Sequence, residues 1–171
     1  MPDARLSTGR LELRPLPAAA AVALLDNREA GSLVLGATLP PDWPQRDLLD
    51  VLPLQAAAAP SDECFGVWVM IERETNTVVG DIGFIGPPDD GGSVEIGYSV
   101  IPDRRRRGYA TEAARTMVSW VLRQPNVSVV VAGCDKHNMP SIRMLEQIGF
   151  LQTGEVDGQI RWRYRPGVES R

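Results

Sequence analysis

Four consecutive arginines, residues 104–107, and the glycine after them, Gly108, are the residues whose types and order most clearly indicate chemistry. They lie between a β-like run that ends at Pro102 and a run with apolar residues at three- and four-residue spacing, which predicts a helix from about Thr111. The first turn of a helix presents N–H groups without acceptors, together with the positive end of the helix dipole. Gly108 has no Cβ, so a ligand can approach the backbone closely. The turn therefore predicts an anion site, and a pyrophosphate fits it well.

Other types of phosphate-binding loop do not fit this turn. No Gly-Lys-Ser/Thr follows Gly108, which excludes a Walker A loop, and the GxGxxG pattern of dinucleotide-binding folds is absent. An ordinary solvated turn is the alternative interpretation of the arginine run. Its place between a β-like run, a strand-ending proline and an amphipathic helix favours the anion site.

The remaining sequence alternates between strand and helix patterns. Strands are predicted at residues 11–16, 65–72, 77–85, 94–101, 127–134, 150–155 and 159–164, and helices at 18–28, 47–59, 111–122 and 139–147. Residues 31–46, with three prolines, and residues 86–92 are predicted as connections, and Pro53 should kink or divide its helix. Asp157-Gly158 predicts a hairpin between the last two strands. This order predicts a mixed α+β sheet flanked by helices.

Two blocks of the sequence resemble the GNAT (GCN5-related) N-acetyltransferase family. Residues 105–110, RRRGYA, match its R/Q-x-x-G-x-G/A motif, and residues 138–150, NMPSIRMLEQIGF, resemble its N-x-x-S-x-R-x-x-E-x-x-G-F segment. The residues that flank the first block are similar to those of the RimJ/RimL branch of this family. With the opening run GRLELRP at residues 9–15, the resemblance covers residues 8–166, which we expect to form a single domain.

The resemblance implies a GNAT-type, mostly antiparallel sheet of about seven strands with about four helices. It also implies a splay between the strand that ends at Ile101 and the strand that ends at Cys134. Acetyl-CoA would be the acyl donor, with its pyrophosphate on the amides of the turn and its pantetheine arm along main-chain groups of the first of these strands. The implied cofactor-binding residues are Ser99, Val100, Ile101, Arg105, Arg106, Arg107, Gly108, Tyr109, Ala110, Thr111 and Asn138.

Acyl transfer from a thioester to an amine needs a neutral amine and a proton for the leaving thiolate. Two residues that serve many family members are missing, because Gly133 stands where related alanine-peptide acetyltransferases have a glutamate and Leu145 where a tyrosine is common. Glu95 is the candidate base, since two-residue alternation places it on one strand face with Gly97, Ser99 and Ile101. A surface carboxylate without a catalytic role is the alternative.

Ser141 is the candidate that steadies or protonates the thiolate, because it lies one turn after Asn138 at a predicted helix start. A first-turn serine that hydrogen-bonds the backbone is the alternative, and Asn138 is also an ordinary type of N-cap. Trp43, in the proline-rich connection, is a candidate for lining the acceptor pocket, with a hydrophobic plug as the alternative.

The function expected from the resemblance is acetyl-CoA-dependent N-acetylation of a primary amine by direct attack in a ternary complex. A protein or peptide N-terminal α-amine is the favoured acceptor, because its pKa near 7.7–8.0 makes deprotonation at pH 7 cost only about 1 kcal/mol. A small amine such as a polyamine, an aminosugar or an amino acid is the alternative acceptor. Because the usual glutamate and tyrosine are missing, a protein that binds acyl-CoA without catalysing transfer is the alternative from a different functional class.

Composition excludes several other classes. The chain has 171 residues, 43% of them hydrophobic, which is enough for one core, and its net charge of −4 argues against a general nucleic-acid binder. Cys64 and Cys134 form neither a disulfide framework nor a zinc pattern, so no metal is expected. No signal peptide or membrane-spanning run is visible, which indicates a cytoplasmic protein without a membrane partner. A homodimer is left open.

Overall fold

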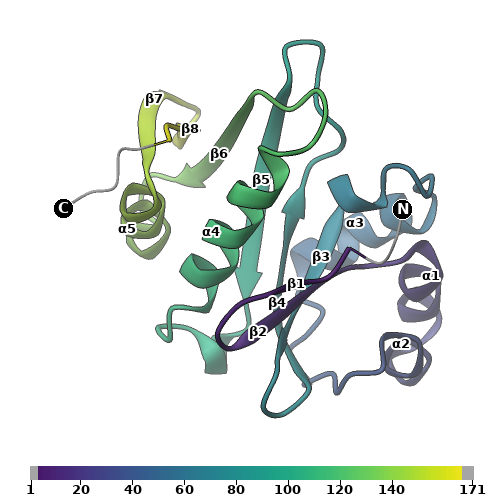
Figure 1. Ribbon diagram of the computed structural model, residues 1–171. Coiled ribbons are helices and arrows are strands. Elements are labelled where there is room, and N and C mark those ends of the chain that lie inside the picture. The colour runs from purple at the N-terminus through teal and green to yellow at the C-terminus, as the bar shows by residue number, and fades with distance from the viewer. Residues whose placement is uncertain (1–3, 167–171) are drawn as a thin grey trace.

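An eight-stranded sheet organises the chain, and helices lie on both of its faces (Figure 1). The computed structural model describes residues 4–166. The strands are β1 (Leu6–Ser7), β2 (Leu11–Pro15), β3 (Val67–Glu72), β4 (Thr77–Phe84), β5 (Ser93–Val100), β6 (Val129–Asp135), β7 (Phe150–Val156) and β8 (Gln159–Tyr164). The helices are α1 (Ala18–Asp26), α2 (Arg28–Leu35), α3 (Arg46–Ala56), α4 (Tyr109–Val121) and α5 (Met139–Ile148), with short 3₁₀ turns η1 (Glu63–Phe65) and η2 (Pro102–Arg104).

The order of strands across the sheet is β1-β2-β3-β4-β5-β6-β8-β7. Every neighbouring pair is antiparallel except β5 and β6, which are parallel. The predicted α+β class with a mixed, mostly antiparallel sheet is therefore confirmed. The structure has one strand and one helix more than expected, the two-residue β1 and helix α2.

Helix α2 corrects the prediction that a connection begins at residue 31. The Asn27 side chain accepts a hydrogen bond from the Ala30 N–H at 2.8 Å and caps a new helix, which ends at Gly36 in the left-handed region (φ 64°). The residues from 31 to 35 suit a helix that buries Leu35, and the prolines that suggested a connection begin only at Pro40. Helix α3 likewise continues through Pro53, so it is not divided there.

Each face of the sheet carries its own hydrophobic core. Helices α4 and α5 cover one face, where Val94, Ile96 and partly buried Tyr98 of β5 belong to the larger cluster. Helices α1 and α3 cover the other face, where Trp43 and Ile101 are buried in the second cluster. The two-residue period of β5 therefore sends even-numbered side chains toward α4 and α5 and odd-numbered ones toward the opposite face.

Strands β5 and β6 separate after a short stretch of pairing. Residues 93–96 pair with residues 129–132, and beyond this point β5 pairs only with β4 and β6 only with β8. Figure 1 shows the two strands diverging on either side of α4. The splay expected from the resemblance is thus present, and we call the space between the diverging strands the wedge. Beyond the paired stretch, β5 is still hydrogen-bonded to β4 and β6 to β8, and no strand among residues 4–166 fills the space between β5 and β6.

Candidate active site

The arginine turn leads into α4 at the open end of the wedge. Arg106 and Gly108 both adopt left-handed backbone angles, with φ of 64° and 80°, and α4 begins at Tyr109. The Glu112 N–H donates to the Gly108 carbonyl at 3.0 Å, whereas none of the N–H groups of residues 106–111 donates to an acceptor among residues 4–166. A cluster of unpaired N–H groups at a helix start is a ready anion site.

Contacts with the β1–β2 turn and with β3 fix the first turn of α4. The Glu112 carboxylate accepts hydrogen bonds from the Arg10 N–H and from Arg10 Nε, both at 2.9 Å, and from the Thr8 hydroxyl. The Arg10 guanidinium lies 4.4 Å from the centre of the Tyr109 ring, whose hydroxyl donates to buried Glu72. These contacts hold the N–H cluster in place without a ligand, which lowers the ordering cost of binding one.

A groove of about 660 Å³ joins this turn to the wedge. It is lined by Gln45, Asp47, Tyr98, Ser99, Val100, Arg104, Arg105, Arg106, Gly108, Tyr109, Ala110, Thr111, Asn138, Pro140, Ser141 and Met144. The structure thus brings together most of the residues that the sequence indicated for cofactor binding, with Ser141 beside them. Ile101, Arg107 and Glu95 do not line the groove.

Ile101 is placed differently from the expectation that its main chain faces the cofactor. Its side chain is buried in the second cluster, and its N–H donates to the Val79 carbonyl on β4 at 3.0 Å. Because neighbouring residues of a strand direct their backbone groups to opposite sides, Val100 and Tyr98 are the residues of β5 whose main chain faces the wedge. Ser99, like Ile101, directs its backbone groups toward β4.

The arginines differ in what they contact. Arg105 donates from Nε to the Val100 carbonyl at 2.9 Å and from Nη2 to Gln45 Oε1 at 3.2 Å. Arg104 lies 3.9 Å from the Glu72 carboxylate and lines the groove, although it was not among the indicated cofactor residues. The side chain of Arg107 is exposed. The turn therefore holds Arg105 in fixed contacts rather than as mobile charge.

Two hydroxyl groups meet across the wedge. Tyr98 of β5 and Ser141 of α5 share a hydrogen bond, and Asn138 Oδ1 accepts from the Ser141 N–H at 3.3 Å as the cap of α5. Burial raises the pKa of Tyr98 to about 12, so its phenol stays protonated near neutral pH. Sequence reasoning missed Tyr98, because alternation groups it with the core residues of β5. Leu145, where a tyrosine is common in the family, is fully buried.

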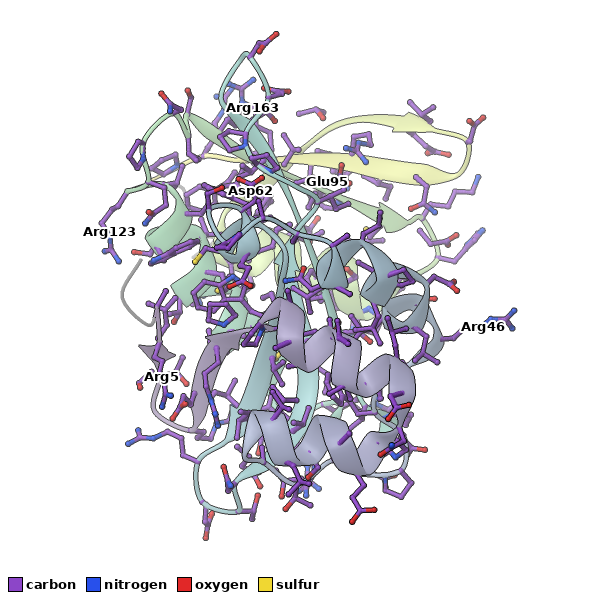
Figure 2. The ribbon with its side chains drawn as sticks, turned by 90° about the vertical axis from the view of Figure 1, so that its right-hand side faces the viewer. Arg5, Arg46, Asp62, Glu95, Arg123 and Arg163 are labelled. Carbon is purple, nitrogen blue, oxygen red and sulfur yellow. The ribbon has the colours of Figure 1, made fainter. Side chains whose placement is uncertain are left out.

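Glu95 lies on the other face of the sheet, which is turned toward the viewer in Figure 2. Its carboxylate forms an ion pair with Arg161 of β8, with 3.1 Å between Oε1 and Nη1. A Cβ on Gly133 would lie 2.6 Å from Arg161 Nη1 and 3.6 Å from Glu95 Oε1, so this pair fills the space that a side chain at Gly133 would need. Arg161 competes with an acceptor amine for the Glu95 carboxylate, and the base role of Glu95 stays a prediction.

Trp43 and Asp81 form a second feature of this face. Trp43 is fully buried, as a plug would be, and its Nε1 donates to Asp81 Oδ2 at 3.0 Å. Asp81 of β4 stands opposite Ser99 in the sheet, and Gln45 Nε2 donates to the Ser99 hydroxyl at 2.7 Å. Burial raises the pKa of Asp81 to about 6. Its sequence signal was a single acidic residue inside the apolar run VVGDIGF.

Among residues 4–166, no group of three or more histidine, cysteine, aspartate or glutamate side chains could hold a metal ion. No helix in the same range is both long and apolar enough to cross a membrane.

Comparisons with known proteins agree on one family. The family model described as "Acetyltransferase (GNAT) domain" matches residues 10–151. The uncharacterized N-acetyltransferase YjdG of Bacillus subtilis (strain 168) is 28% identical over 162 residues, which cover 93% of this chain and 96% of that protein.

Solved structures share the fold. A putative ribosomal-protein-serine acetyltransferase from Vibrio cholerae superposes with a TM-score of 0.68 at 19% identity, over 97% of this chain and 99% of that one. A chimera of the spermidine N-acetyltransferase SpeG from Vibrio cholerae with hSSAT gives a TM-score of 0.62 at 15% identity, over 91% and 95% of the two chains. At these identities the likeness shows the fold alone.

Proposed function

The chain belongs to the GNAT acetyltransferase family and is an N-acetyltransferase, and from this premise we propose that it transfers the acetyl group of acetyl-CoA to the N-terminal α-amine of a protein or peptide. The observation that carries the proposal is the groove that connects the unpaired N–H groups of residues 106–111 with the wedge. A pyrophosphate and an amide-containing arm need these two features at the two ends of one channel.

The residues of the groove fit acetyl-CoA as a cosubstrate. The four non-bridging oxygens of a pyrophosphate diester share two negative charges and need donors, and the start of α4 offers unpaired N–H groups together with the charges of Arg104 and Arg106. The pantetheine arm carries amides that can pair with the wedge-facing main chain of β5 near Val100. The Val100 carbonyl already accepts from Arg105, so its N–H is the group left for the arm.

An α-amine acceptor is favoured by its acidity, and a protein acceptor by the name of one structural neighbour. With a pKa near 7.7–8.0 an α-amine needs only one moderately basic group, whereas a lysine amine near 10.4 costs roughly 4–5 kcal/mol to deprotonate at pH 7. The Vibrio cholerae neighbour is named a "putative ribosomal-protein-serine acetyltransferase". A polyamine stays the second candidate, because the spermidine acetyltransferase chimera has the same fold.

Release of free thiol from acetyl-CoA across a panel of amines tests the proposal. The panel holds a peptide with a free N-terminus, the same peptide N-acetylated, spermidine and an aminosugar. We expect thiol release at pH 7.5 with the free peptide and none with the acetylated one. Turnover with spermidine or the aminosugar alone would replace the acceptor, and CoA binding without any turnover would indicate a non-catalytic module.

Replacing Gly108 tests where the pyrophosphate binds. Gly108→Asp puts a carboxylate into the N–H cluster, and its repulsion should weaken CoA binding by well over tenfold in calorimetry. The backbone strain of a side chain at φ 80° is controlled by Gly36→Asp, at φ 64° and with no heavy atom within 4 Å of its Cβ. Unchanged CoA affinity in a folded Gly108→Asp protein would contradict this assignment.

Ser141 is proposed to donate a hydrogen bond to the departing thiolate, with Tyr98 orienting it. The hydrogen bond between Tyr98 and Ser141 uses the hydrogen of only one of the two hydroxyl groups. Tyr98 can therefore donate to Ser141, while Ser141 donates its own hydrogen to the sulfur of CoA. Full proton transfer from Tyr98 is unfavourable, because its pKa of about 12 exceeds that of a thiol near 8.5. A hydrogen bond carries no such cost.

Ser141→Ala should therefore reduce kcat by roughly tenfold to a hundredfold at saturating acetyl-CoA, the low end of what general acid assistance contributes. The unfolding free energy should fall by no more than ~1 kcal/mol, as for other first-turn polar deletions. Tyr98→Phe keeps the Ser141 hydroxyl and should lose less kcat than Ser141→Ala. A kcat within threefold of wild type, together with a lower melting temperature, would make Ser141 a purely structural residue.

A further inference from the structure

Asp81 is a half-buried carboxylate that the proposed mechanism has not used. In the β4–β5 register it stands opposite Ser99, so the two side chains share one sheet face at a Cα separation of about 5.5 Å. Gly97 is the diagonal neighbour on the same face, about 7–8 Å away. Asp81 therefore lies beside the part of β5 where the wedge begins to open.

The same face offers an acceptor a way to the wedge. On the opposite face α4 and α5 cover β5, where Ile96 is buried and Tyr98 is largely enclosed. Gly97, in contrast, is exposed, and a Cβ built on it would meet no heavy atom within 4 Å. An amine can reach the wedge over this bare stretch of strand. Asp81 and Glu95 are the carboxylates that flank it along the sheet.

The two carboxylates differ in their partners. Glu95 is paired with Arg161 at 3.1 Å. Asp81 has no ion pair with any basic side chain among residues 4–166, and the donor to its Oδ2 is the neutral indole N–H of Trp43. Trp43 is fully buried and so holds this oxygen in one orientation. A half-buried carboxylate without a cation is costly for the fold, which favours a functional role.

The groups around Asp81 suit it to a proton acceptor near neutral pH. Val69 of β3, its other cross-strand neighbour, is apolar, and Asp47 of α3 faces it with a second negative charge. The guanidinium groups of this region are engaged elsewhere. Arg14 of β2, which stands opposite Val69, pairs with Glu12 at 2.6 Å. Arg105 donates to Gln45, and Arg28 donates to the Trp43 carbonyl. Burial first, and Asp47 second, raise the pKa of Asp81 to about 6, where the carboxylate is ionised at pH 7 but more basic than an ordinary aspartate.

We propose that Asp81, rather than Glu95, accepts the proton of the acceptor ammonium, an inference that rests on the proposed acetyl transfer. One proton passes from the ammonium to Asp81, and the nitrogen lone pair attacks the thioester carbonyl carbon. The C–N bond forms, the C–S bond breaks, and the electron pair leaves on sulfur. The second nitrogen proton goes to the thiolate, and Asp81 returns its proton to solvent.

The test is kcat/KM against pH from 5.5 to 9.5 for wild type, Asp81→Asn and the matched Glu95→Gln, with the free-amine peptide as acceptor. Asparagine has the shape of aspartate, and its Oδ1 can still accept from Trp43.

Wild type should hold its activity down to about pH 6, where Asp81 becomes protonated. Asp81→Asn should lose about a hundredfold at pH 6.5 and recover to within about tenfold at pH 9, where the amine is already neutral. Glu95→Gln should stay within about threefold throughout.

Three results would overturn the inference. These are an unchanged profile in Asp81→Asn, a loss in Asp81→Asn that is uniform with pH, and a pH-dependent loss in Glu95→Gln alone, which would return the role to Glu95. Thermal unfolding shows whether each variant folds, and Asp81→Ser, which is smaller and also lacks a carboxylate, replaces Asp81→Asn with the same expected profile if the latter does not fold.

If wild type releases no thiol with any amine, the acetyl transfer itself is contradicted and the role of Asp81 is overturned with it. If wild type is active and Asp81→Asn behaves like wild type, only the role of Asp81 is contradicted.

Discussion

The separation of β5 from β6 after four residue pairs is the constraint on which the site depends. Backbone N–H and C=O groups inside a protein need partners, and a parallel pair that stays together would use all of them. Here each strand is satisfied on its outer edge, by β4 and by β8, and the inner edges are left to face the groove. A ligand with amides of its own can complete the pairing that the protein omits. Helix α4 places its unpaired first turn at the open end of the same gap.

The sheet divides the chemistry between its two faces. Hydroxyl groups of Tyr98 and Ser141 meet on the side of α4 and α5, where burial keeps the phenol protonated. Carboxylates of Asp81 and Glu95 lie on the opposite side, around the exposed Gly97. An acyl group held in the wedge would have hydrogen-bond donors on one side and proton acceptors on the other. This arrangement suits an amine that arrives beside Asp81 and a thiolate that leaves toward the hydroxyls.

Charge follows the same division. The chain carries a net charge of −4, yet Arg104, Arg105 and Arg106 line the groove near the helix start. The basic end of the groove attracts a phosphate-bearing donor, and the negative charges of Asp47 and Asp81 favour an ammonium-bearing acceptor beside β5.

Local sequence patterns made much of the fold predictable. Alternation and turn residues located the strands, the closing hairpin and the helix after Gly108, because these depend on neighbours in sequence. Helix α2 was missed, since its cap at Asn27 and stop at Gly36 were overshadowed by the prolines that follow.

Contacts between distant segments could not be predicted in the same way. Tyr98 with Ser141 and Glu95 with Arg161 depend on how β5, α5 and β8 come together. The direction of the Ile101 N–H depends on the register with β4, which alternation does not fix. Asp81 was visible as an acid in an apolar strand, but its relation to Ser99 and Trp43 required the sheet.

Backbone amide chemical shifts during titration with CoA, and separately with pantetheine, test the central claim most directly. The account predicts that CoA shifts the amides of residues 106–111 together with that of Val100, since the pyrophosphate and the arm occupy the two ends of one groove. Pantetheine has no pyrophosphate and should shift Val100 while leaving residues 106–111 nearly unchanged. Shifts from CoA that leave both regions unchanged and gather elsewhere on the protein would contradict it.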